Sequence, residues 1–265
     1  MANVKTGNNK LNLTNVLEDA RPKDYHEQAL DCSWDEYFKV ISSRRSIRVY
    51  DETPVPADVI RNAIDAGLIA PTSSNLQQTE FYWARSPERK AALVKACLSQ
   101  PAAATSQQLV VVVARTNTWN RNSAAIITQL KDSGAPKSAI AYYEKIVPLA
   151  YRNGPVGLLG IFKRIYFFVK GLAGPVPREP KSFADIRVWT HKSAALAAEN
   201  FMLAISAQGF DTCPMEGFDS KRVKKILGLG CGAEVCMVIS VGKRAKGGVY
   251  GPRMRLPREW FAFEV

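Results

Sequence analysis

The chain has 265 residues, of which 46% are hydrophobic and 23% are charged. This composition excludes a low-complexity or disordered chain and fits one large globular domain or two small ones. The formal net charge of +12 favours an anionic partner, such as nucleic acid, a membrane surface or a phosphate-bearing cofactor. The opening MANVKTGNNKLNLTNV lacks the apolar core of a secretory signal, so we expect a cytoplasmic protein.

The first third of the chain predicts an arm and two helices. Residues 1–32 are polar and are predicted to form an N-terminal arm, followed by a single domain over residues 33–265. A capping box at Ser33 and Glu36 starts the first helix. The second helix carries one apolar stripe and ends at Pro71.

Three further runs are predicted strands, and two longer runs are predicted helices. The buried strands are LVVVVA at 109–114 and VCMVISV at 235–241, both short and rich in β-branched residues. EFYWAR at 80–85 is a third strand, and helices are predicted at 87–97 and 193–208. Because helices and strands alternate unevenly, we expect an α+β layered domain.

Residues 119–192 interrupt this order and are predicted to form a helical lid inserted in the domain. They hold 12 Lys and Arg residues against 4 Asp and Glu residues, a net charge of +8. In the middle, at 155–177, Lys163, Arg164 and Lys170 fall on one side of a helical wheel. The other side is apolar and holds Leu158, Ile161, Phe162, Ile165, Phe168 and Val169.

Two arrangements of this amphipathic helix are open. The first is an amphipathic helix packed on its own protein as a lid or dimer cover. The second is a helix that lies on an anionic membrane surface, which would make the protein membrane-peripheral. A spanning helix is excluded, because it needs about 20 mostly uncharged residues and three cations stand in the middle of this one.

The segment SRRSIRV at 43–49 is a candidate phosphate site. It places three arginines within five positions, with a serine hydroxyl between them. Forked guanidiniums beside a hydroxyl are typical phosphate ligands, because they form charge-assisted hydrogen bonds. The side chains concerned are those of Arg44, Arg45, Ser46 and Arg48.

A second positive fork is predicted near the end of the chain. GPRMRLP at 251–257 holds Arg253 and Arg255, whose side chains point to the same side if the segment is extended. The alternative is a solvated tail without a ligand. Alone, the segment does not decide between these two interpretations.

Two polar segments are candidates for contacts with a flat polar ring. APTSSNLQ at 70–77 offers hydroxyls and amides with little bulk, and TCPMEGFD at 212–219 is predicted to be a loop that brings backbone amides close to a ligand. Each is also compatible with an ordinary turn or connection. The first contributes Pro71, Thr72, Ser73, Ser74, Asn75 and Gln77, and the second contributes Pro214, Met215, Glu216 and Gly217.

Taken together and in this order, the four segments resemble the nitroreductase family of FMN-dependent NAD(P)H oxidoreductases. The resemblance implies a three-layer α/β/α domain with a central, mostly antiparallel sheet. It also implies a domain-intertwined homodimer, in which the loop at 70–77 reaches the flavin bound by the other subunit. The chain departs from the family at Gln77-Gln78, where a Gln-Pro pair is usual, and in the length of the 119–192 span.

The resemblance also implies a role for each matching residue. Arg48 reaches the pyrimidine edge of the flavin ring. Residues 214–217 lie along the flavin with a backbone amide near N5, and the side-chain amide of Gln100 faces the ring. The residues implied at the FMN phosphate are Arg44, Arg45, Ser46, Arg253 and Arg255.

The function implied is a transfer in two steps. NADH or NADPH reduces the bound FMN at N5, and a small electron-poor acceptor such as a nitroaromatic or quinone then takes two electrons. No protein nucleophile and no metal is expected, because the flavin carries the chemistry. Two alternatives stay open: a flavin carrier or redox sensor without efficient turnover, and a basic protein that binds nucleic acid or a membrane surface. The resemblance itself disfavours nucleic acid as a partner.

Overall fold

The computed structural model describes residues 27–154 and 157–265 of the chain. Most of the predicted N-terminal arm lies outside the described residues, and its described part, 27–32, is exposed coil. By internal packing the chain divides into two compact units. Of the described residues, 27–33, 71–78, 115–154 and 157–193 form the helical unit, and 34–70, 79–114 and 194–265 form the sheet unit.

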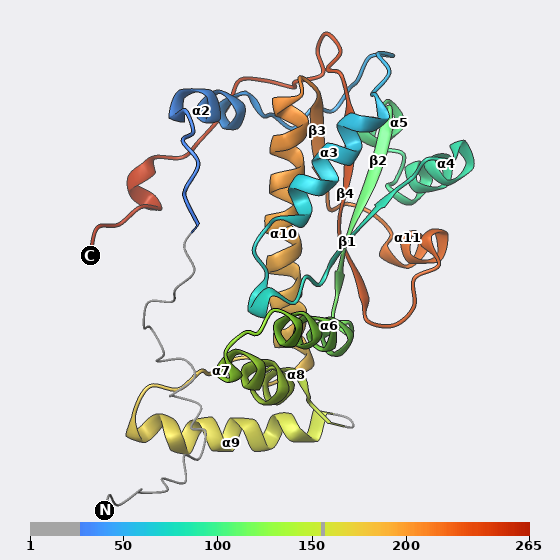
Figure 1. Cartoon of the computed structure of the whole chain (residues 1–265). Helices are drawn as coiled ribbons and strands as arrows, with labels where there is room; N and C mark the ends of the chain where they lie inside the picture. The colour runs from blue at the N-terminus through green and yellow to red at the C-terminus, as the bar shows by residue number, and fades with distance from the viewer. Residues whose placement is uncertain (1–26, 155–156) are drawn as a thin grey trace, which may run out of the picture. The chain divides into compact units, whose positions relative to one another are not determined.

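The sheet unit is built on four strands in the order β1-β2-β4-β3 (Figure 1). The strands are β1 (Thr79–Trp83), β2 (Gln108–Arg115), β3 (Asp211–Met215) and β4 (Ala233–Gly242). β1 pairs antiparallel with β2 and places Phe81 opposite Val112, while β3 pairs antiparallel with β4 and places Cys213 opposite Ser240. The mostly antiparallel sheet expected from the sequence is confirmed.

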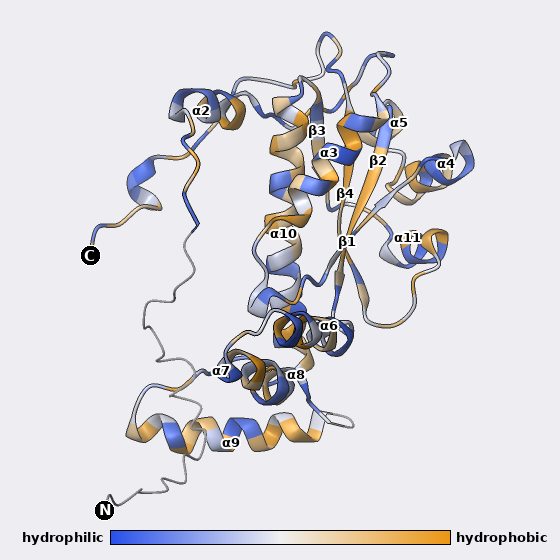
Figure 2. Cartoon of the chain, in the orientation of Figure 1, coloured by the Kyte–Doolittle hydropathy of each residue, from blue (hydrophilic) through white to orange (hydrophobic). Residues whose placement is uncertain are grey.

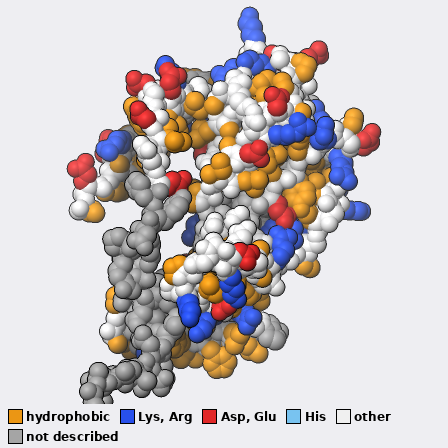
Figure 3. All heavy atoms as spheres, viewed as in Figure 1, with side chains coloured by type: hydrophobic (Ala, Val, Ile, Leu, Met, Phe, Trp, Pro, Cys, Tyr) orange, Lys and Arg blue, Asp and Glu red, His pale blue; other side chains and the backbone are white. Residues whose placement is uncertain are grey.

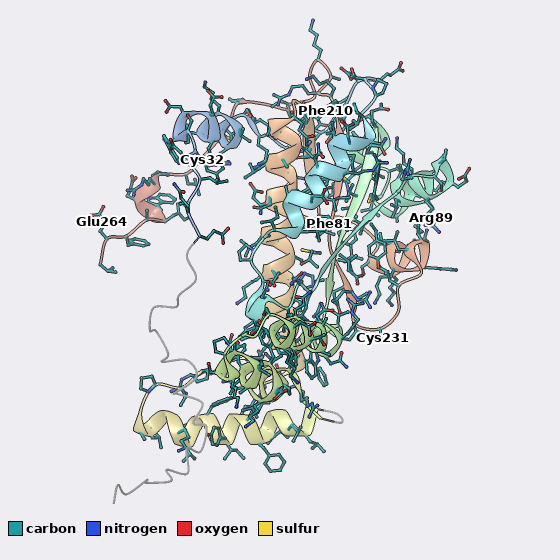
Figure 4. All side chains as sticks on the ribbon, in the orientation of Figure 1. Cys32, Phe81, Arg89, Phe210, Cys231 and Glu264 are labelled. Carbon is teal, nitrogen blue, oxygen red and sulfur yellow. The ribbon has the colours of Figure 1, made fainter. Side chains whose placement is uncertain are left out.

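Helices cover both faces of this sheet, because the side chains of β2 alternate between two cores. Val111 is fully buried in one core and Val112 in the other. Phe81 on β1, labelled in Figure 4, stacks on Phe201 in the second core with ring centroids 5.7 Å apart. The predicted three-layer α+β domain is therefore confirmed. The helices packed on the first face are α4 (Pro87–Ala96), α5 (Pro101–Ala104) and α11 (Ser220–Leu227), and those on the second are α3 (Ala57–Leu68) and the C-terminal part of α10 (Phe183–Ala207).

Two boundaries differ from those predicted. Residues 212–215 lie in β3, so the prediction of a loop there is wrong. Pro214 is tolerated because β3 is an edge strand, where a missing amide donor need not break the sheet. Helix α10 begins at Phe183 rather than near residue 193, because the Ser182 hydroxyl accepts a hydrogen bond from the Asp185 amide and caps the helix.

The helical unit packs short helices around an aromatic core. Leu76, Val147 and Tyr151 are buried in this core, and Tyr151 stacks on Trp119 with ring centroids 5.8 Å apart. The predicted division into an arm, a domain and an insertion at 119–192 stays a prediction. The elements are α6 (Trp119–Asp132), α7 (Lys137–Ala141), η2 (Tyr142–Ile146), α8 (Val147–Tyr151) and α9 (Leu158–Ala173), with the N-terminal part of α10.

Helix α9 packs on the helical unit through the side that carries Lys163, and its apolar side is exposed. Lys163 is 8% exposed, because its Nζ donates to the carbonyl of Ala150 at 2.8 Å, whereas Phe162 and Phe168 are 67% and 65% exposed. Figure 2 shows hydrophobic residues along most of the α9 ribbon. The described chain therefore leaves the apolar side of α9 exposed, and the interpretation of this helix as a lid or dimer cover stays a prediction. No helix within residues 27–154 and 157–265 is both long and apolar enough to cross a membrane.

Candidate cofactor site

The first arginine segment leaves helix α2 (Trp34–Ser43) and runs beside strand β3. Ser46 forms an isolated parallel bridge with Thr212, and the amide of Ile47 donates to the Thr212 carbonyl at 3.0 Å. Ile47 is fully buried. Because side chains alternate along an extended segment, the burial of Ile47 directs Ser46 and Arg48 to the opposite side.

A buried tyrosine and an ion pair hold this segment to the sheet. The hydroxyl of Tyr50 lies 2.9 Å from Ser240 Oγ on β4, and burial raises the pKa of this phenol above its ordinary value. The guanidinium of Arg244 makes a bidentate contact with the buried carboxylate of Asp211, whose Oδ2 also accepts from the Arg244 amide at 3.0 Å. These contacts fix the backbone on which the arginines are carried.

Arginines from both ends of the chain meet around one cavity of about 130 Å³ in the sheet unit. Among the described residues, five arginines and one serine line it, and no acidic residue does. The structure thus brings the two predicted arginine segments together, while the binding of a ligand there stays a prediction. The lining residues are Arg44, Arg45, Ser46, Arg48, Pro252, Arg253, Met254 and Arg255.

The two segments are tied by hydrogen bonds that arginines donate to main-chain carbonyls. Arg253 donates from Nη2 to the carbonyls of Ser42 and Arg44, each at 2.7 Å. Arg45 donates to the carbonyl of Gly251, also at 2.7 Å. A guanidinium has five N–H donors, so both arginines retain donors for a ligand.

The cluster concentrates positive charge with little compensation. Desolvation and the neighbouring guanidiniums of Arg255, Arg45 and Arg44 lower the pKa of Arg253 from its ordinary value. The carboxylate of Glu199 on α10 lies 3.7 Å from Arg44 Nε, and both side chains are partly exposed. An anion placed between these guanidiniums would relieve their mutual repulsion.

Two further groups shape the edge of the cavity. Arg48 is exposed, and its Cζ lies 5.2 Å from the centroid of the Tyr250 ring. Burial raises the pKa of the Cys213 thiol on β3, although nearby Arg48 and Ser46 act in the opposite direction. The thiol therefore stays protonated at neutral pH, which does not favour a role as a nucleophile.

The segment 214–217 lies beside Gln100, as the sequence predicts for two parts of one site. The side-chain Nε2 of Gln100 donates to the Gly217 carbonyl at 2.9 Å. Met215 is buried, whereas Glu216 and Gly217 are exposed. A Cβ added at Gly217 would meet only the Gln100 side chain, at 3.9 Å, so nothing in the described chain requires glycine there. The open space over this backbone is what close approach of a flat ligand needs.

The polar loop at 71–77 belongs to the helical unit and is held in a strained shape. The hydroxyl of Ser74 lies 2.7 Å from that of Tyr142, and the side chain of Asn122 donates to the Leu76 carbonyl at 2.7 Å. Left-handed backbone at non-glycine residues is costly and is found most often at functional sites. Positive φ angles of 53°, 50° and 48° occur at Ser74, Asn75 and Gln77.

The predicted site residues therefore fall into two sets, one in each unit. In the loop, Ser73 and Ser74 line a cavity of about 280 Å³ together with Tyr142 and Trp189. Residues on the outside of the loop are Pro71, Asn75 and Gln77, and Thr72 is half-buried. The other set, in the sheet unit, comprises the arginine cluster, Gln100 and residues 214–217.

Several residues that shape the two sets were missed from the sequence. Asp211 and Arg244 hold the backbone of the first arginine segment, and Tyr142 and Asn122 hold the polar loop. These contacts join residues that are far apart in the chain, so no local sequence motif predicts them. Tyr250 could have been found, because it directly precedes the GPRMRLP segment.

Comparisons with known proteins bear on the family and the fold of the chain. The model of the nitroreductase family matches residues 41–243. MhqN of Bacillus subtilis, which carries the name NAD(P)H nitroreductase, is 29% identical over 210 residues, with 78% of this chain and 88% of MhqN covered.

Solved structures show the same fold. The ydfN protein of Bacillus subtilis superposes with a TM-score of 0.69 at 24% identity, covering 88% of this chain and all (100%) of ydfN. A structure from Exiguobacterium sibiricum, in complex with FMN, has a TM-score of 0.64 at 21% identity, covering 91% of this chain and 100% of that one. Since the family match spans most of its length, the chain belongs to the nitroreductase family, a family of oxidoreductases.

Proposed function

We propose that the chain is an FMN-dependent oxidoreductase that receives hydride from NADH or NADPH and passes two electrons to an electron-poor acceptor, such as a nitroaromatic or a quinone. The observation that carries the proposal is the cavity of the sheet unit, where five guanidiniums and one hydroxyl meet without an acidic lining residue. Membership of the nitroreductase family and the FMN complex of the Exiguobacterium protein support it. NAD(P)H is available in the cytoplasm, where we place the activity.

The donors at this cavity fit the phosphate of FMN. A phosphate monoester carries about two negative charges at neutral pH and offers three strong acceptor oxygens. Planar guanidinium forks meet such oxygens with paired, charge-assisted hydrogen bonds, and they stay charged at any physiological pH. The residues that we propose as phosphate ligands are Arg44, Arg45, Ser46, Arg253 and Arg255.

Other residues of the sheet unit would bind and orient the flavin ring. Bound FMN would supply the hydride and electron chemistry, which no side chain of the chain needs to provide. Arg48 would hold a fixed positive charge at the pyrimidine edge and stabilise negative charge that develops there. The backbone of residues 214–217 would lie along the ring, and Gln100 would keep it there through its bond to the Gly217 carbonyl.

We also propose a domain-intertwined homodimer, in which the loop at 71–77 of one subunit completes the cofactor site of the other. Large exposed apolar side chains on α2 and at the end of the chain support this, because such patches mark interaction surfaces. The tyrosine and asparagine contacts that fix the loop would present it to the other subunit in a single shape, at little entropic cost. The exposed aromatic residues are Trp34, Tyr37, Phe38, Trp260, Phe261 and Phe263.

The test is the absorption spectrum of the purified chain after incubation with FMN, followed by anaerobic addition of NADH and of NADPH in separate experiments. We expect a bound flavin whose absorption band bleaches with at least one nucleotide and returns when a quinone or nitroaromatic is added. The rate with each nucleotide identifies the preferred donor.

Two results would contradict the proposal in different ways. A preparation that stays colourless after incubation with FMN contradicts flavin binding, and salt-sensitive retention on DNA or RNA would then favour the nucleic-acid alternative. A yellow protein that neither nucleotide reduces would be a flavin carrier or redox sensor and not an oxidoreductase.

A further inference from the structure

Helix α9 presents a broad apolar face that the described chain leaves exposed. Phe162, Phe168 and Leu172 are 67%, 65% and 76% exposed. In Figure 3 hydrophobic side chains gather at the lower edge of the view, where α9 lies in Figure 1. An exposed apolar patch of this kind marks a binding surface. The other exposed apolar residues of the helix are Leu158, Leu159, Ile161, Ile165, Tyr166 and Val169.

The opposite side of α9 is a narrow stripe that packs on the helical unit and fixes the orientation of the helix. A Cβ added at Gly160 would collide with the carbonyl oxygen of Lys181, so the two backbones touch there. Lys163 is buried on the same stripe, and its Nζ donates to the Ala150 carbonyl at 2.8 Å. Rotating α9 to bury its apolar face would break the Lys163 hydrogen bond and this backbone contact.

Positive charge borders the apolar face on both sides. At 3.6 residues per turn, Arg164 and Lys170 lie on opposite edges of the face, between it and the packed stripe, and both are exposed. Residues 145–178 contain six Lys and Arg residues and no Asp or Glu. Long cationic side chains at such a border can rest their stems on apolar surface and extend their charge toward phosphate headgroups.

The apolar surface continues into a cavity next to the helix. This cavity has a volume of about 530 Å³ and lies between α9 and the segment of η2 and α8. Phe162 and Tyr166 belong both to its lining and to the exposed face. Lys145 and Arg152 add positive charge to the lining, and its acidic residue, Glu144, forms an ion pair with Lys131 at 3.2 Å. An amphiphile with an acyl chain and an anionic head matches this combination.

We propose that α9 binds the surface of an anionic lipid bilayer, with its apolar face among the upper acyl chains and Arg164 and Lys170 at the lipid phosphates. Charge complementarity selects this occupant. A second copy of the chain seated symmetrically on α9 would bring two cationic borders together, and the repulsion between Arg164 and Lys170 of the two copies would oppose the contact. The proposal goes beyond the oxidoreductase function and does not depend on it.

The test is co-sedimentation of the purified full-length chain with vesicles of phosphatidylcholine and phosphatidylserine at about 3:1, and with vesicles of phosphatidylcholine alone. We expect binding to the anionic vesicles that weakens in high salt. Arg164→Glu with Lys170→Glu should lower the partition coefficient by at least about 25-fold, because loss of each surface cation removes about a factor of five and the new carboxylates add repulsion. Ile165→Ser with Val169→Ser should also weaken binding, without changing the charge.

A matched control separates this surface from net charge. Lys221→Glu with Lys225→Glu makes the same change of charge on α11 and should bind vesicles like the unmodified chain. No binding to anionic vesicles, equal binding to both vesicle types, or an equal loss in the α11 control would each overturn the proposal. So would α9 variants that keep vesicle binding but show a smaller mass in light scattering, which would assign the face to a second copy. All four altered residues of α9 are exposed, and circular dichroism checks that the variants stay folded.

Discussion

The arginine cluster of the sheet unit and helix α9 of the helical unit both concentrate cations, but they place them differently. In the cluster, five guanidiniums line one cavity of about 130 Å³ with a serine hydroxyl among them. On α9, Arg164 and Lys170 stand apart on the two borders of an exposed apolar face. The first arrangement can surround a single small anion, whereas the second can only lie against an extended anionic surface.

The difference teaches that the groups between the cations decide the ligand, more than the amount of charge. In the cluster, some N–H groups of Arg253 and Arg45 donate hydrogen bonds to main-chain carbonyls. These bonds hold the remaining N–H groups of the two guanidiniums in fixed directions. Such preorganisation favours a ligand with matching geometry. Lys170 and Arg164 have no comparable fixed frame around a cavity, and their contribution depends on the sum of attraction to many headgroups.

The largest effect is expected when the cluster loses its second fork. Arg253→Ala with Arg255→Ala should raise the Kd for FMN by at least about a hundredfold, because two charge-assisted hydrogen bonds are lost. Fluorescence quenching of free FMN on titration with protein measures the Kd. Both side chains are exposed, so the global fold should be retained. Full flavin occupancy in this variant would contradict the assignment, and Lys221→Ala with Lys225→Ala is the control for charge alone.

The packing of α9 gives the next largest effect. Gly160→Ala should lower the free energy of unfolding by about 2 kcal/mol, because the new methyl group collides with a backbone oxygen that cannot move aside cheaply. The gain in helix propensity, up to about 1 kcal/mol, offsets this only in part. Urea denaturation followed by circular dichroism measures it. Gly174→Ala is the control, since nothing lies within 4 Å of a Cβ there, and equal losses in both variants would show that α9 is not packed in this way.

The sequence predicts the sheet unit well where local pattern and tertiary burial agree. The run LVVVVA is apolar on both sides, and β2 is buried by helices on both faces. The two arginine segments were predicted to meet, and they do so because Ile47 and Tyr50 are buried beside β3 and β4. For LVVVVA the residues that carry the signal also make the contact, whereas the meeting of the arginine segments was predicted from the family resemblance and not from local pattern.

Prediction fails where a contact from a distant part of the chain decides the outcome. A helical wheel tells which residues of α9 share a side, but it cannot tell which side is buried. The buried side is set by the close approach of the Gly160 and Lys181 backbones and by the hydrogen bond from Lys163 to the Ala150 carbonyl. Both contacts form only when the helical unit is folded. Likewise, Pro214 argues for a loop, yet pairing with Ile239 at the sheet edge makes it part of a strand.

A smaller effect is expected at the segment that would lie along the flavin. Gly217→Ala should raise the Kd for FMN by about tenfold while leaving the melting temperature almost unchanged, because the new methyl group meets nothing closer than the Gln100 side chain at 3.9 Å in the chain itself. Flavin titration and thermal denaturation of the same preparation measure the two quantities. If stability falls and FMN affinity does not, the glycine serves the fold and not a ligand.

The smallest effects are expected when each region is tested with the ligand of the other. Arg164→Glu with Lys170→Glu should leave the Kd for FMN within about twofold, and Arg253→Ala with Arg255→Ala should leave vesicle binding within about twofold. The reason is that Arg164 and Lys170 do not line the cavity of the cluster, and Arg253 and Arg255 do not belong to the face of α9. The two titrations are made in one buffer at physiological ionic strength. Should the α9 reversal release FMN as strongly as the loss of the second fork does, the two regions would act as one positive field. The distinction between a geometric pocket and an extended surface would then have no basis in this molecule.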